Sequence, residues 1–599
     1  MAAETETDPA LQGASWDLEP LLDGQGEERI DAQLDEAQQR ADAFAERYAG
    51  KVAELDGPGL VAAMREIADI YELVGKAGSY ASLRFSTDTT DPARGALLQK
   101  VEERGTAIET KLLFFGLEWA ALDDEKAEEL LAADGLDFAR HHLRMERRYR
   151  PHLLSEPEER LLSEKSVTGR SAWTRLHSEQ VSAIEVEGEP LDVALSRLLS
   201  PDREVRRSTA EAVTEALAPG LRTRAFIYNT LIHDKAVDDR LRKYPTWLTS
   251  RNLSNEVSDE SVQALVEAVK SRYDIPQRWY RLKAQILGID RLADYDRSAA
   301  VTTEDERFGW EESRDLVLDS FGSFSPELEA LARRFFDERW IDAPVRPGKR
   351  GGAFCASAVP SVHPYVMLNF TFKRRDVLTL AHELGHGLHF ALAARQGILQ
   401  QGTPLTVAET ASVFGETIVF NRLLEQTTEP SSRLSLLSEA IEGAIATVFR
   451  QTAMNQFEDA VHTARRTEGE LSVDRFNELW ASTQADLFGD SVEITEGYRT
   501  WWSYIPHFIG TPGYVYAYAY GQLLALSVYG RYLEEGAPFV PCYIEMLAAG
   551  GSMLPEDLGR IVGIDLTDPG FWSAGLELVE GQLQAAEAAA RDAGRLNAG

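Results

Sequence analysis

Apolar residues recur at helical spacing along most of this 599-residue chain. The same periodicity runs through residues 60–73 and 97–122, with Asp, Gly and Pro between the segments. Each such helix must bury one face, so the sequence predicts a mainly α fold built from helical hairpins. The clearest case ends at Gly50, and its apolar positions step by four and three: Ile30, Leu34, Ala37, Ala41, Phe44 and Tyr48.

Two short stretches interrupt the helical pattern. Residues 181–190 alternate in polarity and end in Glu-Gly-Glu-Pro, which predicts a strand and a hairpin turn. A glycine-rich turn followed by the apolar segment 363–370 is the best candidate for a longer strand. Because helical spacing resumes at Leu191, we place a loose boundary near residue 200 and expect an N-terminal helical domain, 1–200, and a second domain, 201–599.

The charge balance limits the partners of the chain. Lys and Arg total 62 against 97 Asp and Glu, which gives a formal net charge of −35. Such a surface repels nucleic-acid phosphates and anionic bilayers, so we expect neither nucleic acid nor a membrane as a partner. Hydrophobic residues make up 44% and charged residues 27%, a balance typical of globular proteins.

Cysteine usage and the N-terminal segment indicate the compartment. The two cysteines, Cys355 and Cys542, lie far apart and predict neither a disulfide framework nor a thiolate zinc site. Residues 1–23 lack the basic and apolar regions of a signal peptide. No apolar run approaches the roughly 20 residues that span a bilayer, so we expect a cytoplasmic protein.

A metal-binding pattern lies within the apolar, proline-free segment 376–395, which Asp376 is expected to cap. The segment contains His-Glu-Leu-Gly-His, from His382 to His386. Residues four apart share a helix face, so the two imidazoles converge on one point. Glu383 points about 100° away, where it can reach a metal-bound water but not the metal. With 11 histidines in the chain, chance produces this pattern in about two of a hundred such sequences, so we predict a zinc site.

A catalytic zinc needs a third protein ligand and one open position. Glu409 follows His386 by 23 residues in the apolar segment 407–416, which is predicted to be a second helix that returns to the metal. Glu416 competes for the same role seven residues later. One carboxylate could bind the metal while the other holds a ligand imidazole in place, and the residues favour Glu409 as the ligand.

A dense aromatic stretch follows His507. Core packing alone would explain these rings. Beside a metallopeptidase motif, however, His and Tyr donors suit an oxyanion that develops at a scissile carbonyl, and His507 is the strongest candidate. The tyrosines alternate with glycine and alanine, after Trp501 and Trp502: Tyr514, Tyr516, Tyr518 and Tyr520.

With these residues identified, the chain resembles the oligoendopeptidase F branch of the thimet oligopeptidase family of zinc metallopeptidases. The resemblance implies a mainly α fold, an elongated helical body with a deep central channel, a thermolysin-like pair of zinc helices and a small β-sheet beside the active site. It covers nearly the whole chain, through Trp16-Asp17-Leu18, Gly348 to Phe354, Leu368-Asn369-Phe370, the helix around His382, Glu409 to Ser412, Ile505 to Phe508, Ala549 to Ser552 and Gly563-Ile564-Asp565.

The resemblance also implies roles for individual residues. Glu409 would be the third ligand of one Zn²⁺ per chain, beside His382 and His386. His507 and Tyr514 would contact the reacting carbonyl. This chain is less aromatic than the family between Phe508 and Gly513, so the donor stays open among Tyr514, Tyr518 and Tyr520. The residues implied in substrate binding are Gly351, Gly352, Ala353, Tyr518 and Tyr520.

Together these features predict a zinc-dependent endopeptidase that hydrolyses short oligopeptides, with residues 201–599 as its catalytic domain. Glu383 would be the general base for a zinc-activated water. The strand 365–370 would offer its backbone edge to an extended peptide. We expect short peptides as partners and a monomer or weak homo-oligomer. The alternatives are a zinc carboxypeptidase or dipeptidase, a non-catalytic peptide-binding protein, and a protein with structural zinc.

Overall fold

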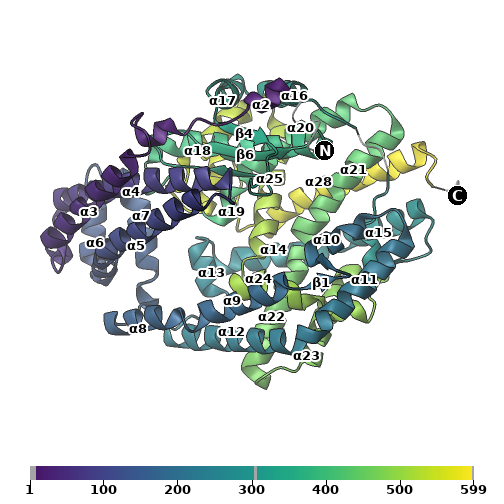
Figure 1. Cartoon of the computed structure of the whole chain (residues 1–599), viewed down its shortest axis with the longest axis horizontal. Helices are drawn as coiled ribbons and strands as arrows, with labels where there is room; N and C mark the ends of the chain where they lie inside the picture. The colour runs from purple at the N-terminus through teal and green to yellow at the C-terminus, as the bar shows by residue number, and fades with distance from the viewer. Residues whose placement is uncertain (1–7, 303–305, 597–599) are drawn as a thin grey trace. The chain divides into compact units, whose positions relative to one another are not determined.

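A computed structural model describes residues 8–302 and 306–596 of the chain (Figure 1). Helices form most of the structure, as predicted, and the strands are short. The chain divides into two compact units, each assembled from three separate stretches of sequence. The first comprises the described residues of 1–150, 305–423 and 528–565, and the second those of 151–304, 424–527 and 566–599.

The first unit begins with a layer of long helices that confirms the predicted periodicity. The predicted helix over 30–48 is α3, which packs against α4 and α5. Side chains of Asp56 and Asp91 cap the latter two helices by accepting backbone N–H groups of their first turns. The helices of this unit are α2 (Pro9–Gly13), α3 (Arg29–Tyr48), α4 (Gly57–Ser86), α5 (Pro92–Ala121), α6 (Asp124–Leu131), α7 (Asp137–Arg148), α16 (Trp310–Phe324), α17 (Pro326–Asp337), α18 (Arg374–Ala393), α19 (Leu405–Ala408), α20 (Thr410–Gln426), α26 (Val540–Ala549) and α27 (Pro555–Ile561).

A three-stranded sheet in the first unit has the order β4-β6-β5. The central strand is β6 (Tyr365–Phe370), which confirms the strand expected over 363–370. It pairs in parallel with β4 (Ile341–Pro344) and antiparallel with β5 (Phe354–Ala356). Both edges of β6 are therefore occupied, so the expectation that residues 365–370 offer a free edge to a peptide is wrong. Among the described strands β5 pairs with β6 alone, so no described strand covers its outer edge.

The helix α18 carries the predicted metal-binding pattern and contacts β5, β6, α16, α17 and α26. It starts at Arg374, two residues before the predicted cap. Asp376 lies in its first turn and accepts the backbone N–H groups of Thr371 and Lys373 at 2.7 and 3.0 Å. The carboxylate therefore stabilises the helix start from inside the first turn rather than from the position before it.

The second unit is also helical. The predicted hairpin is present as β1 (Glu185–Val186) and β2 (Glu189–Pro190), and β3 (Leu292–Ala293) pairs in parallel with β7 (Val492–Glu493). The alanine-rich stretch 585–598 favours a terminal helix, and α28 covers it as far as Asp592; residues 597–599 lie outside the described residues. Its helices are α8 (Glu156–Ser166), α9 (Arg170–Ser182), α10 (Leu191–Ser196), α11 (Arg203–Leu217), α12 (Leu221–Leu241), α13 (Thr249–Ser254), α14 (Asp259–Ser271), α15 (Asp274–Leu287), α21 (Pro430–Ala444), α22 (Arg450–Glu468), α23 (Val473–Phe488), α24 (His507–Gly510) and α28 (Pro569–Asp592).

The helix α25 (Tyr516–Glu535) begins in the stretch assigned to the second unit and ends in that assigned to the first, and α20 continues three residues past the end of the first unit's stretch at Leu423. The two units are defined by contacts, whereas the division near residue 200 was placed where helical spacing resumes in the sequence. The functional division into residues 1–200 and 201–599 therefore stays a prediction.

Candidate metal centre

The structure brings the three predicted metal ligands together in the first unit. The rings of His382 and His386 lie one helical turn apart on α18, with centroids separated by 5.0 Å. Glu409 Oε2 lies 3.3 Å from His382 Nε2 and 3.5 Å from His386 Nε2. The three ligand atoms all lie within 4.8 Å of one another. Two imidazole nitrogens and one carboxylate oxygen thus converge on a single point.

Close contact between α18 and α20 makes this convergence possible. A Cβ atom added at Gly385 would lie 2.4 Å from Ala411 O and 2.6 Å from Ser412 Cα. On the facing helix, a Cβ at Gly415 would lie 3.0 Å from Ala381 O. The two backbones therefore touch where each helix carries a glycine, and Glu409 at the start of α20 is held against the histidines. This role of Gly385 and Gly415 was not predicted, although glycine inside a predicted helix is a sequence signal for close packing.

The electrostatics of the site favour a cation. Burial alone would lower the pKa of His382, but hydrogen bonds to Glu409 and Glu416 outweigh burial and raise it to about 10. Burial tends to raise the pKa of Glu409, yet its hydrogen bond to His382 and the two imidazoles lower it to about 2. Ser412, which is fully buried, donates a further hydrogen bond to Glu409 Oε2 at 2.7 Å. Neighbouring carboxylates therefore stabilise positive charge at His382, whereas burial lowers the pKa of His386 to about 4 and favours its neutral, metal-binding form.

Glu416 occupies a different position from Glu409. Its Oε2 lies 3.1 Å from Nδ1 of His382, on the side of the ring opposite the shared ligand point. This geometry favours the arrangement in which Glu409 binds the metal and Glu416 fixes the orientation and tautomer of His382.

Glu383 is 7% exposed and lies beside β5. Burial raises its pKa to about 7, against the opposing effects of His382 and of a hydrogen bond from the backbone N–H of Cys355. A carboxyl group that titrates near neutral pH can accept a proton and return it during one reaction cycle. The predicted general base therefore has a suitable protonation equilibrium.

The predicted glycine turn leads directly into β5. Lys349, whose side chain is fully buried, donates from Nζ to Asp342 Oδ1 and Leu368 O, both at 2.6 Å. Asn369 Nδ2 donates to Gly352 O at 2.8 Å. These bonds tie the turn to β4 and β6, and Gly352 has a positive φ of 81° that suits glycine. The turn formed by Gly351, Gly352 and Ala353 thus precedes the strand that contacts Glu383. The sequence pattern did not predict the role of Lys349 in holding this turn.

In the second unit, three of the predicted aromatic site residues form one cluster. His507 Nε2 lies 3.3 Å from the hydroxyl of Tyr518, and the rings of His507 and Tyr514 stack at 6.0 Å. Tyr514 and Tyr518 contact edge to face at 5.0 Å. Burial, with the positive charge of Arg450, lowers the pKa of His507, which favours the neutral imidazole. All three side chains are partly exposed.

Two tyrosines of the stretch after His507, Tyr516 and Tyr520, point into the core of the protein. Tyr516 and Tyr520 are fully buried, and Tyr520 lies 3.3 Å from the hydroxyl of Ser261 and packs its ring on Trp572. Tyr516 and Tyr520 therefore pack in the core. Because Tyr520 is buried, its position does not favour the substrate contact that was predicted for it.

Side chains from three helices hold the loop between His507 and Tyr514. Arg170 donates to Gly510 O at 3.2 Å, and Arg251 donates to Pro512 O at 3.4 Å. Glu458, which is fully buried on α22, accepts the backbone N–H of Gly513 at 2.9 Å. These anchors lie far from the loop in sequence, so no local pattern predicts them.

An apolar helix that carries His-Glu-x-x-His, a third carboxylate and a buried acid defines a class of metal-dependent hydrolase. Residues 327–578 match the family model described as peptidase family M3, and residues 118–185 match the model described as oligopeptidase F. Oligopeptidase PepF of Bacillus subtilis is 27% identical over 90% of this chain and 82% of its own length. Group B oligopeptidase PepB of Streptococcus agalactiae is 26% identical over 86% of this chain and 87% of its own.

Solved structures share the fold. A putative peptidase from Chlamydophila abortus superposes with a TM-score of 0.87 at 21% identity, over 98% of this chain and 99% of the other. An oligoendopeptidase F from Enterococcus faecium gives 0.71 at 21% identity, over 94% and 99% of the two chains. The chain belongs to peptidase family M3, in its oligoendopeptidase F branch, and is a metalloendopeptidase. None of the helices in the described residues has the length and apolar character needed to cross a bilayer.

Proposed function

We propose that the chain is a zinc-dependent endopeptidase that hydrolyses short oligopeptides, with one Zn²⁺ held by His382, His386 and Glu409. The observation that carries this proposal is the meeting of the three ligand atoms within 4.8 Å, beside a buried Glu383. Two imidazoles and one carboxylate form the donor set of catalytic zinc sites that keep a position open for water. The surrounding carboxylates, which favour a cation, support the fit.

When bound, zinc supplies Lewis-acid activation of a water molecule. In the proposed mechanism Glu383 accepts a proton from that water as it attacks the peptide carbonyl. Glu383 then returns the proton to the leaving amine, so the same carboxyl serves as base and acid. His507, Tyr514 and Tyr518 are proposed as hydrogen-bond donors to the developing oxyanion, since a neutral imidazole and two partly exposed phenols can all donate.

The outer edge of β5 is the proposed docking strand for an extended peptide. Its Cys355 N–H already contacts Glu383, so a peptide paired along this edge would pass the catalytic carboxyl. Backbone pairing makes few demands on side chains and would give broad specificity. The preceding turn, Gly351 to Ala353, would leave room for the peptide. We also propose that the protein is a cytoplasmic monomer or weak homo-oligomer. Its fold would contain a deep central channel, with residues 1–200 forming one wall.

Two other functions compete with this proposal. A carboxypeptidase or dipeptidase uses the same metal chemistry but removes residues from a chain end. A non-catalytic peptide-binding protein would have no need of a buried carboxyl whose pKa is about 7, and Glu383 is therefore the observation against it.

The test combines metal analysis with product analysis. Purified protein is incubated with a peptide that offers several internal bonds, with and without a chelator, and the products are identified by mass spectrometry. We expect internal cleavage, loss of cleavage with the chelator, recovery with zinc, and one zinc per chain. Products shortened only from one end would favour an exopeptidase, and unchanged cleavage after chelation would exclude the metal mechanism.

A further inference from the structure

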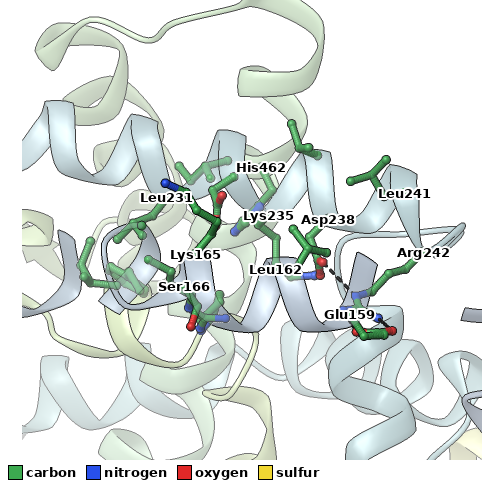
Figure 2. A pocket seen from close by; sticks show the side chains of 18 residues that line it. Glu159, Leu162, Lys165, Ser166, Leu231, Lys235, Asp238, Leu241, Arg242 and His462 are labelled. Carbon is green, nitrogen blue, oxygen red and sulfur yellow. Dashed lines mark hydrogen bonds and ion pairs between the residues drawn. The ribbon is translucent and has the colours of Figure 1, made fainter. Parts of the chain in front are cut away.

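The second unit contains a cavity of about 480 Å³ that the proposed metal chemistry does not use (Figure 2). Its walls come from α8, α9, α12, α22, α24 and Pro512, and every lining residue belongs to the second unit. The volume falls within the roughly 300–1,000 Å³ typical of small-molecule sites. Leu162, Leu231, Phe508 and Ile509 give the cavity an apolar lining that suits an aliphatic side chain.

One end of the cavity carries an excess of positive charge. Lys235 lines the cavity and donates to Asp239 and, at 3.1 Å, to Ser250 Oγ. Asp239 is almost fully buried and also pairs with Arg466. Two cations therefore share one carboxylate, so this group of three side chains has a net charge of +1. Asp234 and Arg170 also line the cavity and interact with each other. An anionic ligand group would be stabilised there.

His462 lies near Lys235 at the same end (Figure 2). Its side chain is 1% exposed and its ring stacks on Trp247 with centroids 4.3 Å apart. Neither ring nitrogen has a hydrogen-bond partner within the part of the chain that the structure describes. A buried polar group without a hydrogen-bond partner is destabilising. Both nitrogens are covered in the structure, so a ligand acceptor reaches them only after the ring turns toward the cavity.

The opposite end carries an excess of negative charge. Arg242 donates to Glu159 Oε1 at 2.7 Å and to Asp238 Oδ1 at 2.8 Å, so two carboxylates share one guanidinium (Figure 2). Along α12, Asp238 follows Lys235 by three residues, about 4.5 Å, and Arg242, which holds Glu159, follows it by seven residues, about 10 Å. An extended peptide spans about 3.3–3.6 Å per residue, so two or three residues bridge this distance.

We propose that this cavity binds a short peptide of two or three residues with free termini and an aliphatic side chain. Its carboxylate lies toward Lys235 and His462, and its ammonium group toward Glu159 and Asp238. Because Phe508 and Ile509 directly follow His507, the bound peptide contacts the loop that positions the aromatic cluster. Peptides of this size are the product class of an oligopeptidase, and binding here does not depend on the proposed zinc mechanism.

The test is calorimetric titration of the full-length protein with dileucine and with its N-acetylated and C-amidated forms, checked for hydrolysis by mass spectrometry. We expect dileucine to bind in a saturable way and either blocked form to bind at least tenfold more weakly. These comparisons use the unmodified protein, so they hold even if a variant fails to fold. Absence of saturable binding at millimolar dileucine, or equal binding of blocked and free peptides, would overturn the proposal.

Variants assign each terminus to its partner. Lys235→Met is expected to remove the difference between free and amidated dileucine, and Asp238→Asn the difference between free and acetylated dileucine. Arg240 is exposed on the same helix and does not line the cavity, so Arg240→Met is the matched control and should bind like the parent. If Lys235→Met and Asp238→Asn also bind all three peptides like the parent, dileucine binds elsewhere and the assignment of this cavity is wrong.

Discussion

Substitution of Gly385 by alanine tests the packing that brings Glu409 to the histidines. The new Cβ would lie 2.4 Å from Ala411 O, whereas ordinary contact begins near 3.4 Å, so the helices must separate by about 1.0 Å (3.4 − 2.4). Metal–ligand distances tolerate only about ±0.2 Å. Overpacking of this kind costs about 1–3 kcal/mol of stability. We expect Gly385→Ala to lower the melting temperature and to weaken zinc binding by about 10- to 100-fold, as loss of ligand support does.

The control is an alanine where no atom obstructs it. A Cβ at Gly443 in α21 has nothing within 4 Å, so Gly443→Ala should stabilise the helix by about 0.5–1 kcal/mol and leave zinc binding unchanged. Stability is measured by thermal unfolding and zinc affinity by competition with a chromogenic chelator. If Gly385→Ala retains the parent's zinc affinity and melting temperature, close contact of the two helices does not set the position of Glu409.

Three further substitutions probe the site and the loop. Glu416→Gln should weaken zinc affinity by about 10- to 100-fold while activity recovers at saturating zinc, because only the support of the imidazole is altered; an unchanged affinity would contradict this. Burial raises the pKa of Glu458 to about 8, so the folded state retains a proton that the unfolded chain loses near 4.5, and stability falls as pH rises across that interval. Glu458→Gln should therefore gain melting temperature relative to the parent between pH 5 and 8, and a pH-independent difference would refute the assignment. Tyr518→Phe should lower kcat by about 10²- to 10³-fold if its hydroxyl stabilises the oxyanion, and a normal kcat would remove it from the mechanism.

Local patterns in the sequence predicted the parts of the site that depend on helix periodicity. The four-residue spacing of His382 and His386 places both imidazoles on one face of any regular helix, and the predicted helix over 30–48 matches α3 within one residue. Glu409 could be predicted from its position within an apolar segment. Its contact with the histidines depends on the packing of α20 against α18, which a local pattern does not show.

Features set by contacts between distant segments could not be predicted in this way. The strand β5 is three residues long and gives no periodic signal, so the sequence could not show that it covers one edge of β6. Lys349 is buried because its ammonium group meets carbonyls of two strands, and nothing near it in the sequence indicates this. The burial of Tyr520 likewise depends on Ser261 and Trp572, which lie on other helices.

Anomalous X-ray scattering from crystals of the protein, recorded on both sides of the zinc absorption edge, tests the central claim most directly. The account predicts one zinc peak per chain, about 2.0–2.2 Å from His382 Nε2, His386 Nε2 and a Glu409 oxygen, with a fourth position open to solvent. A zinc peak elsewhere, or an ion whose fourth position is closed by a protein side chain, would contradict it.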